Sequence, residues 1–138
     1  MSVLKKSRQG FTLIELLIVV AIIGMMLSVS LPMSFSMYES YKASLKAQEV
    51  MVFVSSLRRE SFLYSERKVL SSKNDVITID ENKKVFEDTR VQIDSPIKFY
   101  RNGTTSGGTI RIYVGGQAYS LSVGAPLGEL LLTRTGSA

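Results

Sequence analysis

The stretch RQGFTLIELLIVVAIIG, residues Arg8 to Gly24, places a single carboxylate, that of Glu15, near the start of a long apolar run. No residue from Leu16 to Tyr38 is charged, and a helix needs about 20 apolar residues to cross the hydrocarbon core of a bilayer. The stretch therefore predicts one membrane-spanning helix. A carboxylate deep in a bilayer costs about 2.5 to 3.5 kcal/mol on insertion scales, so Glu15 requires a partner or a function there.

Positive charge precedes this run and does not follow it closely. Lys5, Lys6 and Arg8 are the only charged residues among the first ten, and without them the formal charge falls from +5 to +2. Because positive flanks stay in the cytoplasm, the short N-terminal segment is expected inside and the larger C-terminal part in the bacterial periplasm or at the cell surface. The small remaining excess gives little support to a nucleic-acid partner.

The composition restricts the chemistry available to the chain. It contains neither Cys nor His, which excludes disulfides, thiolate or imidazole metal sites, Ser/His/Asp triads and Cys/His dyads. The pairs Asp80/Glu81 and Glu87/Asp88 flank residues 82–84, where a hairpin turn is expected, and indicate solvated charge. No catalytic residue, metal or cofactor is therefore expected.

Helical spacing continues beyond the apolar run but becomes amphipathic. The apolar positions with this spacing are Val50, Phe53, Val54, Leu57 and Tyr64. The pattern predicts one helix from Phe11 to about Lys68, whose second part follows the membrane segment over residues 34–70.

From residue 71 onward the sequence is typical of strands. A polar break over residues 71–75 is followed by period-two alternation, clearest in TIRIYVGGQAYSLSV, where Gly115 and Gly116 form the expected hairpin turn. Strands are predicted at 76–79, 91–93, 97–101, 110–114, 119–123 and 130–133. The fold class expected is α+β: a long N-terminal helix whose C-terminal part, about Tyr41 to Tyr64, packs on a small antiparallel sheet in a head of residues 71–138.

Residues 1–30 admit two ordinary interpretations. One is a cleaved signal peptide, with SVS at Ser28 to Ser30 as its cleavage site. The other is a plain single-span anchor. Glu15 interrupts the apolar region that the first requires, and the second leaves this residue unexplained.

A third interpretation rests on family resemblance. KKSRQG followed by FTLIELLIVVAIIG resembles the class III signal of type IV pilins and type II secretion pseudopilins. The resemblance implies that a prepilin peptidase removes residues 1–10 by cutting between Gly10 and Phe11, and methylates the new amine of Phe11. Residues 11–33 would then remain as the transmembrane segment and filament core.

The resemblance also gives Glu15 a role. The cationic amine of Phe11 can pair with Glu15 of its own chain or of a neighbour, so that the two charges neutralise each other in lipid. Glu15 is thereby implied to be an assembly residue. The partners implied are other pseudopilins or pilins, prepilin peptidase and the inner-membrane assembly platform.

Gly24 and Pro32 predict a kink or a local loosening of the helix. Pro32 removes one helical hydrogen bond and frees the carbonyl of Ser28, to which the hydroxyls of Ser28 and Ser30 could respond. Pro and Gly are also common in membrane helices without such a role. In the resembled family, this region is thought to melt during extrusion into the pilus.

The end of the chain, NGTTSGGTIRIYVGGQAYSLSVGAPLGELLL, resembles that of H-type minor pseudopilins and their minor pilin relatives, the GspH/FimT group. This implies a minor pseudopilin of a type II secretion pseudopilus, anchored in the inner membrane with a periplasmic head. The alternative is a minor type IV pilin that primes a pilus for adhesion, motility or DNA uptake. Basic residues near aromatics, Lys98, Arg101 and Arg111, could hold single-stranded DNA, but exposed strands alternate in the same way, and nucleic acid is not expected as a partner.

Overall fold

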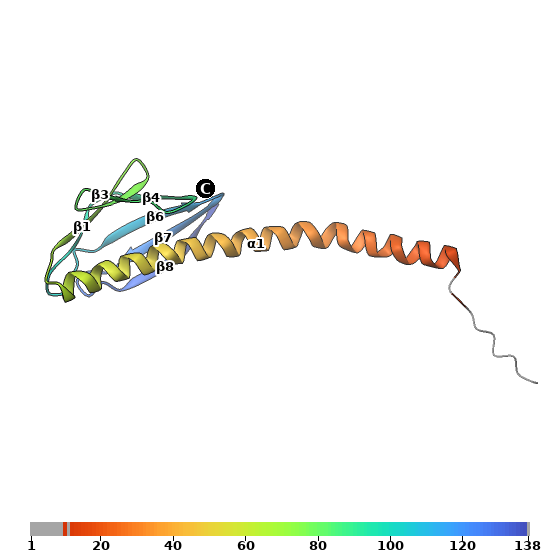
Figure 1. Cartoon of the computed structure of the whole chain (residues 1–138), viewed down its shortest axis with the longest axis horizontal. Coiled ribbons are helices and arrows are strands. Elements are labelled where there is room, and N and C mark those ends of the chain that lie inside the picture. Colours follow the sequence, from red (N-terminus) through yellow and green to blue (C-terminus); the bar gives the residue numbers. More distant parts are fainter. Residues whose placement is uncertain (1–9, 11, 138) are drawn as a thin grey trace, which may run out of the picture. The chain divides into compact units, whose positions relative to one another are not determined.

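The structure, a computed structural model, describes residue 10 and residues 12–137 (Figure 1). The chain divides into two compact units, one ending at Glu39 and the other beginning at Ser40. The first unit is helical throughout residues 13–39. The second combines the end of the same helix with all the strands. From here on, the head means this second unit and not residues 71–138 alone. The expected α+β class is confirmed, with a long N-terminal helix and antiparallel sheets.

Helix α1 runs from Leu13 to Leu63 and contains Pro32. It ends about five residues earlier than the sequence predicted, because Ser65 adopts a left-handed conformation with φ of 50°. The amide of Glu66 then donates to the carbonyl of Ser61 at 3.1 Å, and that of Ser65 to Phe62 at 3.4 Å. This pair of bonds is the Schellman motif that closes helices.

Eight strands form two antiparallel sheets of four strands each, not the single sheet expected. The first sheet has the order β3-β2-β1-β5 and the second β4-β6-β7-β8. The sheets interleave along the chain, since β4 belongs to the second sheet and β5 returns to the first. The strands are β1 Lys68–Lys73, β2 Val76–Ile79, β3 Asn82–Lys84, β4 Thr89–Ile93, β5 Ile97–Phe99, β6 Gly108–Val114, β7 Gln117–Val123 and β8 Leu130–Ser137.

Every predicted strand is present, but β1 and β3 were not predicted. Strand β1 includes residues 71–73, which were assigned to a polar break, and β3 replaces the turn expected at residues 82–84. The true turns are Asn74-Asp75 and Asp80-Glu81, whose four φ angles lie between 47° and 74°. Two successive residues with positive φ form a type I′ hairpin turn, which holds β1, β2 and β3 in one meander.

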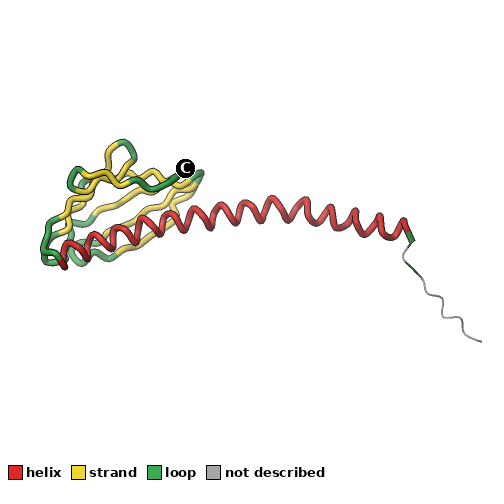
Figure 2. Tube along the Cα trace, viewed as in Figure 1, coloured by secondary structure: helices red, strands yellow, loops and turns green. Residues whose placement is uncertain are grey.

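The core of the head lies between the strands and one stripe of α1, and Figure 2 shows strands lying along this part of the helix. The buried residues of α1 are Ala43, Ala47, Val50, Val54, Leu57 and Ser61. Their alternating spacing of four and three residues is the seam of an amphipathic helix. Phe53 is only half-buried, and Tyr64, predicted on the same face, is 70% exposed because it lies beyond the helix end.

Candidate assembly site

The start of α1 is closed by a reciprocal pair of hydrogen bonds between Thr12 and Glu15. The amide of Thr12 donates to Glu15 Oε2 at 3.2 Å, and the amide of Glu15 donates to Thr12 Oγ1 at 3.2 Å. This arrangement is a capping box, which satisfies two amides that the first helical turn leaves free. The pattern T-x-x-E was present in the sequence, but it was not used to place the helix start.

The capping box gives Glu15 an electrostatic role in the single chain. A carboxylate in the first turn of a helix also interacts favourably with the positive end of the helix dipole. Both residues are exposed, so the carboxylate remains accessible to a second donor. The predicted donor, the amine of Phe11, lies outside the described residues, and the pairing therefore stays a prediction.

Gly10, the predicted residue before the cleavage, is exposed, and a Cβ built on it would have no atom within 4 Å. Packing in this chain therefore does not require glycine at position 10. Gly24 also has open space around it, since a Cβ built there would have no atom within 4 Å.

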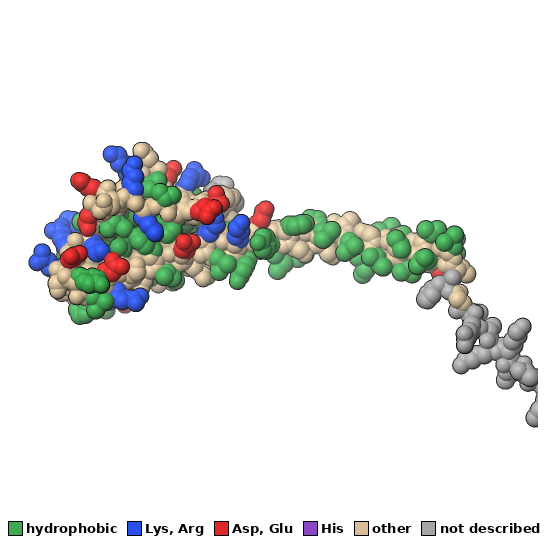
Figure 3. Space-filling model, viewed as in Figure 1, with side chains coloured by type: hydrophobic (Ala, Val, Ile, Leu, Met, Phe, Trp, Pro, Cys, Tyr) green, Lys and Arg blue, Asp and Glu red, His purple; other side chains and the backbone are tan. Residues whose placement is uncertain are grey.

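The first unit is an apolar helix with no buried residue. Every residue from Thr12 to Glu39 is exposed, and the large apolar side chains among them have exposed fractions of 44% to 76%. Figure 3 shows hydrophobic side chains along this part of the helix, with almost no charge among them. By length and composition α1 can cross a membrane. A helix that is apolar on all sides requires lipid or other helices around it.

The segment around Pro32 remains helical. Ser28 Oγ donates to the carbonyl of Met25 at 2.7 Å, and Ser34 Oγ donates to that of Ser30 at 2.9 Å. Neither bond reaches the carbonyl of Ser28, which Pro32 leaves without its usual donor. The hydroxyls of Ser28 and Ser30 therefore do not bond the carbonyl that Pro32 frees, contrary to what the sequence had suggested. The kink between Gly24 and Pro32 stays a prediction.

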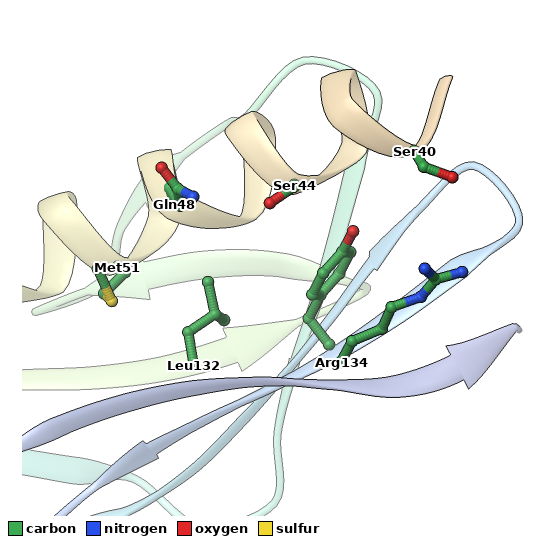
Figure 4. A pocket seen from close by; sticks show the side chains of 7 residues that line it. Ser40, Ser44, Gln48, Met51, Leu132 and Arg134 are labelled. Atoms are coloured by element: carbon green, nitrogen blue, oxygen red, sulfur yellow. The ribbon is translucent and has the colours of Figure 1, made fainter. Parts of the chain in front are cut away.

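The head contains an open hollow of about 510 Å³ beside α1, β7 and β8 (Figure 4). It is lined by Ser40, Ser44, Gln48, Met51, Tyr119, Leu132 and Arg134. Gln117 Nε2 donates to Ser40 Oγ at 2.8 Å, and the hydroxyl of Tyr119 donates to Gln117 Oε1 at 3.2 Å. The lining holds one guanidinium but no carboxylate, so it offers no acid and base pair for catalysis.

The acidic pairs considered in the sequence have structural contacts. Asp80 Oδ1 accepts a hydrogen bond from the amide of Val69 at 3.0 Å. Asp88 Oδ2 lies 3.2 Å from Lys46 Nζ, which ties the segment before β4 to α1. In the described part of the chain, no group of three or more Asp or Glu is placed to hold a metal ion.

The basic residues considered for DNA binding do not form one site. Lys98 lies on β5 of the first sheet and is half-buried, whereas Arg111 lies on β6 of the second. Arg111 donates to the carboxylate of Asp94, and this hydrogen bond raises the pKa of the guanidinium. Figure 3 shows Lys and Arg interspersed with Asp and Glu over the visible face of the head.

Comparisons with known proteins agree with the features of both units. Residues 5–31 match the prokaryotic N-terminal methylation motif. Two fimbrial proteins of Pseudomonas aeruginosa are each 38% identical over 69 residues, a match that spans 49% of this chain but only 42% of their own length. The minor pseudopilin EpsH from the Type 2 Secretion System of Vibrio cholerae has a similar fold, with a TM-score of 0.51 at 14% identity over 68% of this chain and 98% of EpsH.

The motif matches the start of the chain, whereas the similarity to EpsH concerns the fold of the chain. The motif includes Gly10, Phe11 and Glu15, where the sequence predicted processing and assembly. Helix α1, exposed over residues 13–39 and packed on sheets over residues 40–63, gives the fold that the resemblance implied. The chain therefore carries an N-terminal methylation motif, is similar to fimbrial proteins over about half of its length, and has a fold similar to that of a minor pseudopilin.

Proposed function

We propose that this chain is a structural subunit, a minor pseudopilin of a type II secretion pseudopilus, with no enzymatic activity of its own. The observation that carries the proposal is the exposed apolar half of α1, which has Glu15 in its first turn and no buried residue from Leu13 to Glu39. Such a surface is stabilised only by lipid or by the helices of other subunits. The fold shared with EpsH supports a pseudopilin, and the hollow beside α1, β7 and β8 has no carboxylate in its lining.

In this proposal, assembly uses the cap at the helix start. Prepilin peptidase cuts after Gly10 and methylates the amine of Phe11, which stays cationic. The carboxylate of Glu15 already accepts the amide of Thr12, and it can accept an ammonium group more strongly because both partners are then charged. An amine from an adjacent subunit therefore sets the axial position at which the helices pack.

The proposed location follows from the same features. The single span lies in the bacterial inner membrane, with the N-terminus cytoplasmic before cleavage and the head periplasmic. The partners are other pseudopilins, prepilin peptidase and the inner-membrane assembly platform.

A second candidate function is a minor type IV pilin that primes a pilus for adhesion, motility or DNA uptake. The similarity to the two fimbrial proteins of Pseudomonas aeruginosa favours it. Both functions use the same processing and the same helix. The genes that neighbour the gene of this protein distinguish the two functions. A secretion operon would support the pseudopilin, and pilus genes would support the pilin.

Processing is tested with two glycine variants, Gly10→Val and Gly24→Val, because both positions have open space around them. Mass spectrometry of the membrane fraction should find methylated Phe11 as the N-terminus of the wild type and of Gly24→Val. The Gly10→Val chain should keep its leader. A mature chain that begins at Leu31 would show a cleaved signal peptide and would exclude the filament subunit.

Assembly is tested with Glu15→Ala and the control Glu39→Ala, which removes the other carboxylate of the first unit. Glu15→Ala should reduce crosslinking to partner pseudopilins while the chain stays in the membrane, because the span becomes more apolar. Glu39→Ala should crosslink as the wild type does. Wild-type crosslinking by Glu15→Ala would remove this residue from the assembly mechanism.

A further inference from the structure

Four arginine side chains gather where α1 ends, on two adjoining hollows of the head. Arg58 and Arg59 line a hollow of about 480 Å³, and Arg67 and Arg101 line a second of about 620 Å³. Both hollows include Asn102 and Thr104, so they form one continuous area. We name this area the arginine surface; it consists of Arg58, Arg59, Arg67, Arg101, Phe62, Tyr100, Asn102, Thr104 and Leu127.

The fold fixes the place of these side chains. The turn after β5 is held by the bonds from the amide of Tyr100 to the carbonyl of Thr104 at 2.8 Å and from Gly103 to Tyr100 at 3.1 Å. Arg58 Nε donates to the carbonyl of Gly103 at 3.3 Å, which joins α1 to this turn. Arginines far apart in the sequence thereby converge, which the sequence did not predict.

The positive charge of the arginine surface is not balanced by the residues that line it. No acidic side chain lines either hollow. The ion pairs found within residues 12–137 engage Lys46, Lys68 and Arg111, and none of the four arginines. Glu60, on the same part of α1, is already bonded to Lys68 at 2.9 Å. The guanidinium groups therefore remain available to an anionic partner.

Apolar side chains lie beside the charges. Phe62 is 59% exposed and Leu127 is 61% exposed, and both line the hollow that holds Arg58 and Arg59. Arginine and aromatic residues are enriched in protein interfaces, where Lys is depleted. The hollows contain no Lys, so their composition is that of a protein-binding surface.

The arrangement is less suited to single-stranded nucleic acid. Such ligands need open aromatic faces on which successive bases stack. The guanidinium of Arg67 lies 6.0 Å from the centre of the Tyr100 ring and covers one face of it. Phe62 is left as the single exposed ring with no cation over it on this surface.

We propose that the arginine surface binds an acidic segment of a protein partner that carries an apolar side chain beside its carboxylates. The planar guanidinium groups donate paired hydrogen bonds to Asp or Glu carboxylates, and the apolar side chain packs between Phe62 and Leu127. This contact belongs to the head and not to the exposed helix. Loss of the contact therefore leaves processing at Gly10 and assembly through Glu15 unchanged.

The test uses the full-length chain in micelles of an uncharged detergent and measures fluorescence anisotropy. The first probe is a labelled peptide in which Asp and Glu alternate with Leu and Phe. The second replaces the acids by Asn and Gln, and the third is a labelled single-stranded oligonucleotide of equal charge. The double variant Arg59→Ala/Arg101→Ala is compared with Lys73→Ala/Lys83→Ala, which removes the same charge from exposed positions elsewhere.

The acidic peptide should bind saturably, and the Kd should rise about tenfold in the arginine variant but less than about twofold in the lysine variant. Leu127→Ser should weaken binding of the acidic peptide and leave binding of the oligonucleotide unchanged. Thermal unfolding of each variant checks that the head stays folded. Equal binding of the amide peptide, equal effects of the two double variants, or no saturable binding would overturn the proposal. Tighter binding of the oligonucleotide, insensitive to Leu127→Ser, would reassign the surface to nucleic acid.

Discussion

The two parts of α1 differ in where their apolar side chains lie, although they form one helix. Residues 13–39 are apolar on all sides and none is buried. Residues 40–63 bury a single stripe against the sheets and expose charged residues on the other side. Burial of apolar area is the main favourable contribution to folding, so only the second part can stabilise the head. The apolar side chains of the first part require lipid or other helices around them.

The largest effect is expected from an aspartate placed in each part. Val54→Asp buries an unpaired charge in the core, where Val54 is 0% exposed, and should reduce the free energy of unfolding by about 3 to 5 kcal/mol. Val20→Asp, at an exposed position, should leave the unfolding midpoint of the head unchanged and reduce membrane retention. Circular dichroism and membrane fractionation measure the two effects. Equal destabilisation of the head by both variants would contradict the comparison.

A smaller and local effect is expected at the helix start. Thr12→Ala removes the hydroxyl that accepts the amide of Glu15 and should destabilise the first turn by about 1 kcal/mol. Amide hydrogen exchange near Leu13 should become faster, while the midpoint for the head stays the same. Ser34→Ala, which removes a mid-helix bond to the carbonyl of Ser30, is the control. A shift in the midpoint for the head would show that the two parts are coupled.

A somewhat smaller effect on stability is expected at Lys84, beside the part of α1 that packs on the sheets. Lys84 Nζ lies 5.6 Å from the ring centre of Phe53 and 5.8 Å from that of Phe86, and the two rings meet edge to face. Lys84→Gln should cost about 0.5 to 1 kcal/mol, because an exposed cation over an aromatic ring contributes about that much. Lys83→Gln, on the same strand, should cost less. Chemical denaturation measures both, and equal losses would remove the aromatic contact as the cause.

The smallest effect, and one of opposite sign, is expected at Ser61. Its hydroxyl is buried without a hydrogen-bond partner within residues 12–137. Because an unpaired buried hydroxyl is unfavourable, Ser61→Ala should stabilise the head by about 0.5 kcal/mol. Ser56→Ala, which removes a bond of 2.7 Å to the carbonyl of Phe53, should not stabilise it. A lower midpoint for Ser61→Ala would indicate that the hydroxyl has a partner, such as a bound water.

The sequence predicted those elements whose apolar residues repeat with a clear period. The alternation in β6 and β7 around Gly115-Gly116 gave the hairpin and its turn correctly. Strand β3 was missed because all three of its residues are exposed and polar, so its pairing with β2 determines its conformation. In β1, only Leu70 is fully buried, which leaves no alternation to detect.

The candidate site was predictable to different degrees. Glu15 could be singled out because a charge in an apolar run is costly, and its cap with Thr12 was readable from their spacing. The convergence of Arg58 and Arg101 was not predictable. It depends on the turn after β5 reaching the end of α1, where Arg58 contacts Gly103, 45 residues further along the chain. Local sequence patterns carry no signal for such a contact.

The interleaved order of the two sheets has a consequence for how the head unfolds. Strand β4 pairs with β6, whereas β5, which only three residues separate from β4, pairs with β1. Neither sheet can be detached as a continuous piece of chain, because each contains a strand enclosed in sequence by strands of the other. The head should therefore melt in one cooperative step, without a state in which one sheet survives alone. We therefore expect the head to respond to mechanical or thermal stress as a single unit, and not as two halves that open in turn.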